Sequence, residues 1–245
     1  RANYFDDIKG GTTPVHAACT LPKDASALEA LIAFAKTEPG DDLKPLFDLP
    51  STVLKATPLH CAAEVGNSAQ LEVLLKLGID ANGENAYGDT PLLVACANNQ
   101  AECVKLLLDH NADPTKANHK KQNALHMAVA GLGKALRSEE GKENENVEEK
   151  LLVAKRLLEA PKVPLAKRID PNHADANGQT PLHHIAVMKE RPATVALAKL
   201  LLASGGKAKV MDASGKRPSE LGAGRATPRG ELTALLKRHE LLVLG

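Results

Sequence analysis

The stretch ATPLHCAAEVGNSAQLEVLLKLGIDAN, residues 56–82, contains two short apolar segments separated by Gly-Asn and followed by a second glycine. Thr57 is a good N-cap, and Pro58 suits the first helical position, where its missing N–H costs no hydrogen bond. His60 then falls at the third helical position, from which a side chain reaches back to the cap. Gly78 can end a helix in the left-handed conformation. The stretch therefore predicts two short helices joined by a turn.

The same pattern recurs along the chain. It begins at Thr13, Thr57, Thr90, Asn123 and Thr180, and a weaker copy begins at Arg217. The steps from residue 57 to 90 and from 90 to 123 are both 33 residues, and a fixed period of this size is typical of stacked arrays. Helices of about ten residues are too short to persist alone in water. We therefore expect neighbouring units to cover each other's apolar faces.

The motifs that carry a family resemblance are TPVHAAC (13–19), TPLHCAA (57–63), TPLLVAC (90–96), NALHMAV (123–129) and TPLHHIA (180–186). On these motifs the chain resembles the ankyrin repeat family. The resemblance implies an all-α solenoid of helix–turn–helix units with short projecting β-hairpin loops, about five full repeats and a C-terminal cap.

We expect a single domain over residues 1–245. Its repeats would begin near residues 11, 55, 88, 121 and 178, with a degenerate cap repeat at 215–245 and insertions at about 38–55 and 132–155.

The insertions carry their own predictions. A helix is expected over 25–37, followed by an elongated loop in which Leu46, Phe47 and Leu49 fold back on the stack. The second insertion contains RSEEGKENENVEEK (137–150), with six glutamates, and favours a solvated segment followed by a long helix from Val147. This segment is either a tolerated surface elaboration or a second contact site for a basic partner.

Composition restricts the core and the partners. Aromatic residues make up 2% of the chain and Trp is absent, so the core must be aliphatic. Residues 1–150 hold 15 Lys/Arg and 22 Asp/Glu (net −7), and residues 151–245 hold 16 and 8 (net +8). Basic residues do not alternate with aromatic ones, which disfavours nucleic-acid binding. No apolar run approaches ~18 residues, so we expect no membrane span.

The cysteines indicate the cellular compartment in which the protein occurs. Cys19, Cys61, Cys96 and Cys103 show no CxxC spacing, and free buried thiols are typical of a reducing environment. We therefore expect a cytoplasmic protein, with the nucleus as the alternative. The chain begins with Arg1, which fits a fragment of a longer protein.

The histidines and aspartates that could take part in catalysis or metal binding occupy equivalent positions in the repeat. His16, His60, His126 and His183 share the third helical position, and Leu93 replaces this histidine in the third unit. We therefore interpret these histidines as structural and His184 as a variable neighbour. Asp80, Asp113 and Asp170 also share one position and are expected to accept turn N–H groups. The sequence predicts no catalytic residue, no metal site and no cofactor, and the chain is not expected to be an enzyme.

The resemblance implies that partners contact the hairpin tips and the inner faces of the first helices. Tyr87 is either an exposed anchor for a partner or a ring packed over the neighbouring hairpin. Lys121 replaces the usual turn glycine, so we expect that hairpin to be distorted. The predicted partner-binding residues are Val53, Leu54, Glu64, Val65, Tyr87, Asp89, Asn98, His119, Lys120, Gln122, Asn177, Gln179, Met188 and Lys216.

Two functions remain open. The first is a monomeric, non-catalytic scaffold or adaptor that binds a protein or peptide partner along the concave face and the hairpin tips. The second is a regulatory or targeting module of a larger enzyme or channel. An enzyme in its own right and a nucleic-acid binder are the weaker alternatives.

Overall fold

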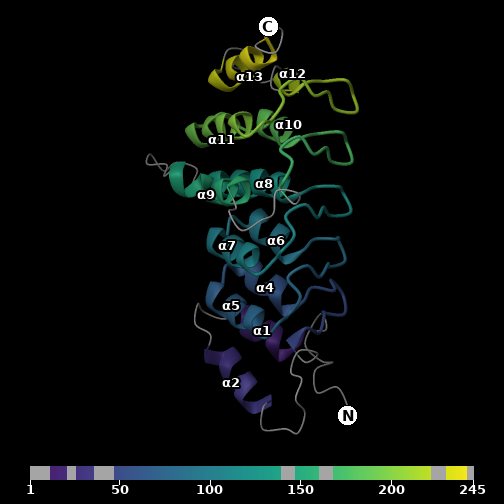
Figure 1. Cartoon of the computed structure of the whole chain (residues 1–245), viewed down its shortest axis with the longest axis vertical. Helices are drawn as coiled ribbons and strands as arrows, with labels where there is room; N and C mark the ends of the chain where they lie inside the picture. Colours follow the sequence, from purple (N-terminus) through teal and green to yellow (C-terminus); the bar gives the residue numbers. More distant parts are fainter. Residues whose placement is uncertain are drawn as a thin grey trace.

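The helices of the computed structural model stack in pairs along one axis (Figure 1). The model describes residues 12–20, 26–35, 47–138, 147–159, 168–221 and 230–241. An inner row of helices lies next to a series of projecting turns, and an outer row lies on the side away from these turns. The inner row consists of α1 (Pro14–Thr20), α4 (Pro58–Val65), α6 (Pro91–Ala97), α8 (Ala124–Ser138), α10 (Pro181–Ala186) and α12 (Pro218–Leu221). The outer row consists of α2 (Ser26–Ala35), α5 (Ser68–Lys76), α7 (Ala101–Asp109), α9 (Val147–Leu158), α11 (Pro192–Ala203) and α13 (Glu231–Leu241).

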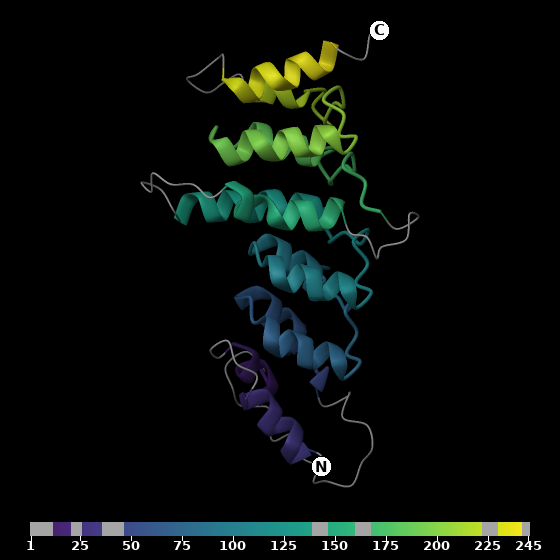
Figure 2. The same ribbon diagram turned by 60° about the vertical axis from the view of Figure 1, so that its left-hand side comes forward.

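Contacts between neighbouring pairs run through the whole stack. Each inner helix packs against the outer helix of its own pair, and the inner row is in continuous contact from α1 to α12. The outer helices α5, α7, α9, α11 and α13 also contact one another in order. Figure 2 shows the pairs as successive layers across the long axis. Each pair therefore buries the apolar face that its neighbour exposes, as the short helices require.

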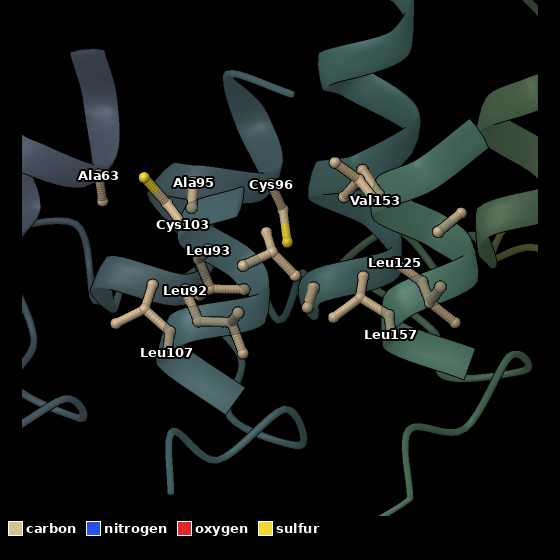
Figure 3. Close-up of a cluster of buried hydrophobic side chains, with 14 of the residues drawn as sticks. Ala63, Leu92, Leu93, Ala95, Cys96, Cys103, Leu107, Leu125, Val153 and Leu157 are labelled. Carbon is tan, nitrogen blue, oxygen red and sulfur yellow. The ribbon is translucent and has the colours of Figure 1, made fainter. Parts of the chain in front are cut away.

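The core is aliphatic. Leu92 and Leu93 of α6 are 1% exposed, and they belong to one cluster with Leu107 of α7, Leu125 of α8 and Leu157 of α9 (Figure 3). Full burial of a leucine side chain contributes roughly 1.5–3 kcal/mol. Because these side chains come from successive units, this contribution stabilises the contacts between units as well as each unit.

The first helix of the fourth pair is longer than the sequence predicts. The second insertion is expected to begin at about residue 132, yet α8 continues to Ser138. A Cβ at Gly131 would collide with the Cys96 carbonyl oxygen of α6. The glycine therefore permits the close approach of α8 to α6, and part of the insertion lengthens a helix.

The predicted helices beside the insertions are present, whereas the prediction for the first loop holds for Phe47 and is wrong for Leu49. The helix expected over 25–37 is present as α2, and α9 begins at Val147 and has 12 residues. Phe47 is 1% exposed and folds back on the stack, whereas Leu49 is 41% exposed. Leu46 and the acidic centre of the second insertion, 139–146, lie outside the described residues.

The C-terminal pair covers the end of the stack. Leu232 and Leu236 of α13 are buried, and α13 contacts both α11 and α12. Leu241, at the end of α13, is 69% exposed. Residues 242–245 lie outside the described part of the chain.

Candidate functional site

The inner row is built on a repeated threonine–histidine cap. In the second unit, the Nδ1 atom of His60 accepts the Thr57 N–H at 3.1 Å and the Thr57 hydroxyl at 2.8 Å. The proton of the neutral ring therefore lies on Nε2, which donates to the Asp89 carbonyl oxygen of the next unit at 2.9 Å. His16 makes the same contacts with Thr13 and the Ala56 carbonyl oxygen. The structural interpretation of these two histidines is confirmed.

Burial keeps the capping histidines neutral. It lowers the pKa values of His16 and His60 from their ordinary range, although the hydrogen bond to a backbone carbonyl opposes the shift in each case. Burial also lowers the pKa of His126 to about 4, and the neighbouring His184 and His173 add to this shift. A neutral ring with one N–H suits the cap, because one nitrogen accepts and the other donates.

The projecting turns are joined to one another by backbone hydrogen bonds. Within one turn, the Gly88 N–H donates to the Asn85 carbonyl oxygen at 2.9 Å. The bonds between successive turns run from the N–H of Ala86 to Leu54, of His119 to Tyr87, of Ala176 to Lys120 and of Ala213 to Asn177, at 2.8–3.0 Å. The turns in the described residues contain no assigned strand, and they form a continuous row along one edge of the stack (Figure 1).

The turn at Lys121 keeps the geometry of the others. Lys121 adopts the left-handed conformation, with φ of 57°, where Gly88 and Gly178 have φ of 75° and 74°. Its N–H donates to the Asn118 carbonyl oxygen at 2.7 Å, so the turn closes as its neighbours do. The expected distortion of this hairpin is therefore wrong.

Several predicted partner-binding residues lie exposed on the row of turns. Val53 is 66% exposed, Leu54 46% and Tyr87 60%. His119 and Lys120 follow on the next turn and are also exposed. Because Leu54 bonds to the turn of Tyr87, and Tyr87 bonds to the turn of His119, this apolar and then basic sequence of side chains is continuous in space. We call these five residues the tip strip.

Other predicted residues have bonds within the protein. Asp89 accepts from the Asn118 side-chain amide at 2.9 Å, which links two turns. Asn98 accepts from Lys134 Nζ at 2.6 Å and donates to the Val94 carbonyl oxygen at 3.0 Å. These hydrogen bonds fix the positions of Asp89 and Asn98 within the protein.

The remaining predicted residues spread over the inner surface and the later turns. Gln179 donates to Asp212 at 3.3 Å, which again links two turns. Of the rest, Glu64, Val65, Asn177 and Lys216 are exposed, and Gln122 and Met188 are half-buried.

The structure also brings together a group that the sequence analysis does not connect. His126 of α8, Asp175 of the following turn and His184 of α10 each place one ligand-type atom within 4.8 Å of the others. His184 Nε2 lies 2.9 Å from Asp175 Oδ2. The His126 ring is edge-on to His184 at 5.2 Å and to His173 at 6.0 Å between centroids.

The sequence signal for this group is weak. The pair at 183–184 and the additional histidine at 173 are visible, but His126 is separated from them by the insertion. Only the stacking of units four and five makes the three residues neighbours.

Comparison with known families agrees with the stacked architecture. A model described as ankyrin repeats (3 copies) matches residues 59–138, and an ankyrin repeat model matches residues 177–216. The chain contains ankyrin repeats. The expected fold, an all-α ankyrin solenoid with projecting loops, is confirmed, and ankyrin repeats are modules that bind proteins.

The ankyrin repeats are similar to segments of long curated proteins. The chain is 45% identical over 60 residues to the ARF GTPase-activating protein Git of Drosophila melanogaster, a match covering 24% of this chain and 8% of that protein. It is 36% identical over 73 residues to the E3 ubiquitin-protein ligase KEG of Arabidopsis thaliana, covering 30% and 4%. It is 39% identical over 79 residues to the human transient receptor potential cation channel subfamily A member 1, covering 30% and 7%. The chain thus spans less than a tenth of the length of each relative.

The described helices of this ankyrin-repeat chain include none that is long and apolar enough to cross a membrane.

Proposed function

We propose that this ankyrin-repeat chain is a non-catalytic scaffold or adaptor that binds a protein or peptide partner along the tip strip and the adjacent inner helix face. The observation that carries the proposal is the tip strip itself, in which exposed Val53, Leu54 and Tyr87 are followed by His119 and Lys120. Large exposed apolar side chains next to charged ones are typical of binding surfaces, and tyrosine often dominates the binding energy. The backbone bonds between turns hold this surface in shape before a partner arrives.

The tip strip also favours a particular chemistry in the partner. An apolar segment would contact Val53, Leu54 and Tyr87, and acidic groups beyond it would face His119 and Lys120. We therefore propose a partner segment in which apolar residues are followed by Asp or Glu. We further propose that the chain acts as a monomer. We also propose that it works in a reducing compartment of the cell, which its four free cysteines support.

The test is affinity capture of partners from cell extract with the native chain and with the double variant Tyr87→Ala, Lys120→Glu. We expect the partners recovered by the native chain to be lost with the double variant, because the aromatic anchor and the adjacent positive charge are both removed. Lys237→Glu, an exposed charge reversal on α13, serves as the control and should leave capture unchanged. Undiminished recovery with the double variant would show that the tip strip is the wrong surface.

A second candidate function is a regulatory or targeting module within a larger enzyme or channel. It is favoured by the comparisons, because the matched segments are small parts of proteins named as a GTPase-activating protein, a ligase and a channel. Sequencing the complete transcript tests it. A coding region that adds no further domain to these repeats would dismiss this candidate.

A further inference from the structure

The contact between the fourth and fifth units differs from the other contacts in the stack. Here His126 of α8 faces the turn that contains Asp175 and the start of α10, where His184 lies. We propose that His126, Asp175 and His184 form a binding site for a divalent transition-metal ion of the zinc class. This proposal goes beyond partner binding, and neither the fold nor the proposed function requires it.

The distances suit such an ion. The three ligand-type atoms lie within 4.8 Å of one another, and His184 Nε2 lies 2.9 Å from Asp175 Oδ2. Zinc binds imidazole nitrogen and carboxylate oxygen at about 2.0–2.2 Å in tetrahedral geometry, which places ligand atoms roughly 3.3 Å apart. Small side-chain movements would therefore bring all three groups onto one ion.

The cap of the fourth unit supplies an independent argument. Asn123 replaces the threonine, and its Oδ1 lies 2.7 Å from His126 Nδ1. At the other side of the ring, Nε2 lies 2.9 Å from the Gln179 carbonyl oxygen. Both of these nearest partners are hydrogen-bond acceptors, whereas a neutral imidazole has a single N–H. The Asn123 N–H also points at Nδ1, at the longer distance of 3.4 Å. One of the two ring nitrogens therefore faces an acceptor without a proton between them.

Two other arrangements could satisfy this ring, and each has a cost. Turning the Asn123 amide over would remove the bond from its amide nitrogen to the Asp170 carbonyl oxygen at 3.3 Å and the cap bond from the His126 N–H at 3.2 Å. Protonating both nitrogens would place a charge on a ring that is 1% exposed, which burial disfavours.

A metal ion at Nε2 avoids both of these costs, in exchange for the long bond from the Asn123 N–H to Nδ1 at 3.4 Å. Nδ1 then carries the proton and donates to Asn123 Oδ1, which is the usual arrangement for a histidine that ligates a metal. The Gln179 carbonyl oxygen, at 2.9 Å from Nε2, is close enough to become a fourth ligand.

The combination of residues in the group is particular to this contact. The positions that correspond to His184 hold Ala17, Cys61, Val94 and Met127, and those that correspond to Asp175 hold Asn85 and Asn118 in the second and third turns. Asp212 occupies the Asp175 position in the last turn, but Leu221 stands there at the His184 position. The usual threonine cap donates its hydroxyl to Nδ1, which leaves the proton on Nε2, so that atom could ligate a metal only after a change of tautomer. The potential site therefore does not arise from the repeat pattern itself.

The surroundings of the group are suited to binding and access. Asp175 accepts the N–H groups of Asn177 and Gln179 with Oδ1, at 2.8 and 3.0 Å, so Oδ2 is oriented toward His184. Burial opposes ionisation of Asp175, but these bonds and the one from His184 hold its pKa below the ordinary value. The His184 side chain is 26% exposed and gives an ion a route from solvent.

The test uses the complete 245-residue chain after treatment with a chelator. Titration with Co²⁺, followed by its visible absorption, and competition by Zn²⁺ are expected to show one tightly bound ion per chain in tetrahedral geometry. The variants His184→Val and Asp175→Asn should each weaken Zn²⁺ binding at least tenfold. Both substitutions copy residues from the same place in other units, so they are expected to preserve the fold.

Two further variants make the test specific. Asn123→Thr should weaken Zn²⁺ binding about 10–100-fold without touching a ligand, because the threonine hydroxyl returns the proton to Nε2. His173→Ala should leave the affinity unchanged, because His173 Nε2 is paired with the Lys121 carbonyl oxygen at 3.0 Å. The absence of saturable one-ion binding, or equal affinity in the native chain and the folded His184→Val variant, would overturn the proposal.

Discussion

In successive units a single histidine side chain joins the start of the inner helix to the turn of the following unit. The ring of His60 accepts two hydrogen bonds at Nδ1 and donates one at Nε2 to the next turn. Leu93 shows that the stack tolerates the loss of this residue in one unit, where Thr90 alone caps the helix by accepting the Leu93 N–H at 3.3 Å. The histidine is thus replaceable but contributes to the contact between units.

At this scale we expect the substitution His60→Leu to destabilise the chain by about 1–3 kcal/mol, because the Thr57 N–H and the Asp89 carbonyl oxygen each lose a partner. A lower denaturant midpoint in urea unfolding would demonstrate the effect. His110→Ala, which removes an imidazole at the end of α7, provides the control. Unchanged unfolding of His60→Leu would mean that the histidine contributes nothing to the contact.

At the scale of the element, the turns depend on close approach between neighbouring units. Gly178 has φ of 74°, and a Cβ on it would lie 2.7 Å from the Ala213 nitrogen in the next turn. Gly215 has φ of 76°, but a Cβ there would meet nothing within 4 Å. Gly178 therefore requires both a left-handed backbone and room for the next turn, whereas Gly215 requires the left-handed backbone alone.

Alanine substitutions at Gly178 and Gly215 give a matched pair of variants. Gly215→Ala should cost about 1–2 kcal/mol, because only the left-handed backbone is penalised. Gly178→Ala should cost clearly more, since the turn of the fifth unit must also move away from the next. Thermal or urea unfolding of both variants measures the difference, and equal losses would contradict the close approach that the structure shows.

At the scale of the whole molecule, buried histidines make stability depend on pH. Burial lowers the pKa values of His16 and His60 in the folded chain, whereas in the unfolded chain both return to the ordinary value of about 6.5. Below that pH the unfolded state binds more protons than the folded state, so the free energy of unfolding falls as the pH falls. Above it, the stability is fully present.

We therefore expect the urea midpoint to be lower at about pH 5.5 than at about pH 7.5, in a range where ordinary carboxylates remain ionised. The measurement is made with a chelator present, so that metal binding does not contribute. The His60→Leu variant should lose less stability over this range than the native chain. A midpoint that is independent of pH would contradict the prediction.

The sequence predicts much of the architecture because caps are local. Thr57, Pro58 and His60 fix the start of a helix through residues that are adjacent in the chain, and the structure confirms that start. The length of α8 could not be predicted, because Gly131 is explained by the nearness of α6 and not by its own neighbours in sequence.

The candidate sites were predictable to different degrees. The exposure of Tyr87 follows from its place at a turn tip, and the structure shows it exposed. Its role in binding stays a prediction. The group of His126, Asp175 and His184 could not be predicted, because the repeat pattern shows that the fourth and fifth units stack but not which of their side chains face one another.

At the tips, the bonds that join each turn to the one before it use main-chain atoms alone. A side chain at a tip can therefore be exchanged without loss of the bond beneath it. Substitutions at positions such as Val53 or Tyr87 would redirect the chain to a new target while the architecture stays intact. At these tip positions, specificity can thus evolve without loss of the fold.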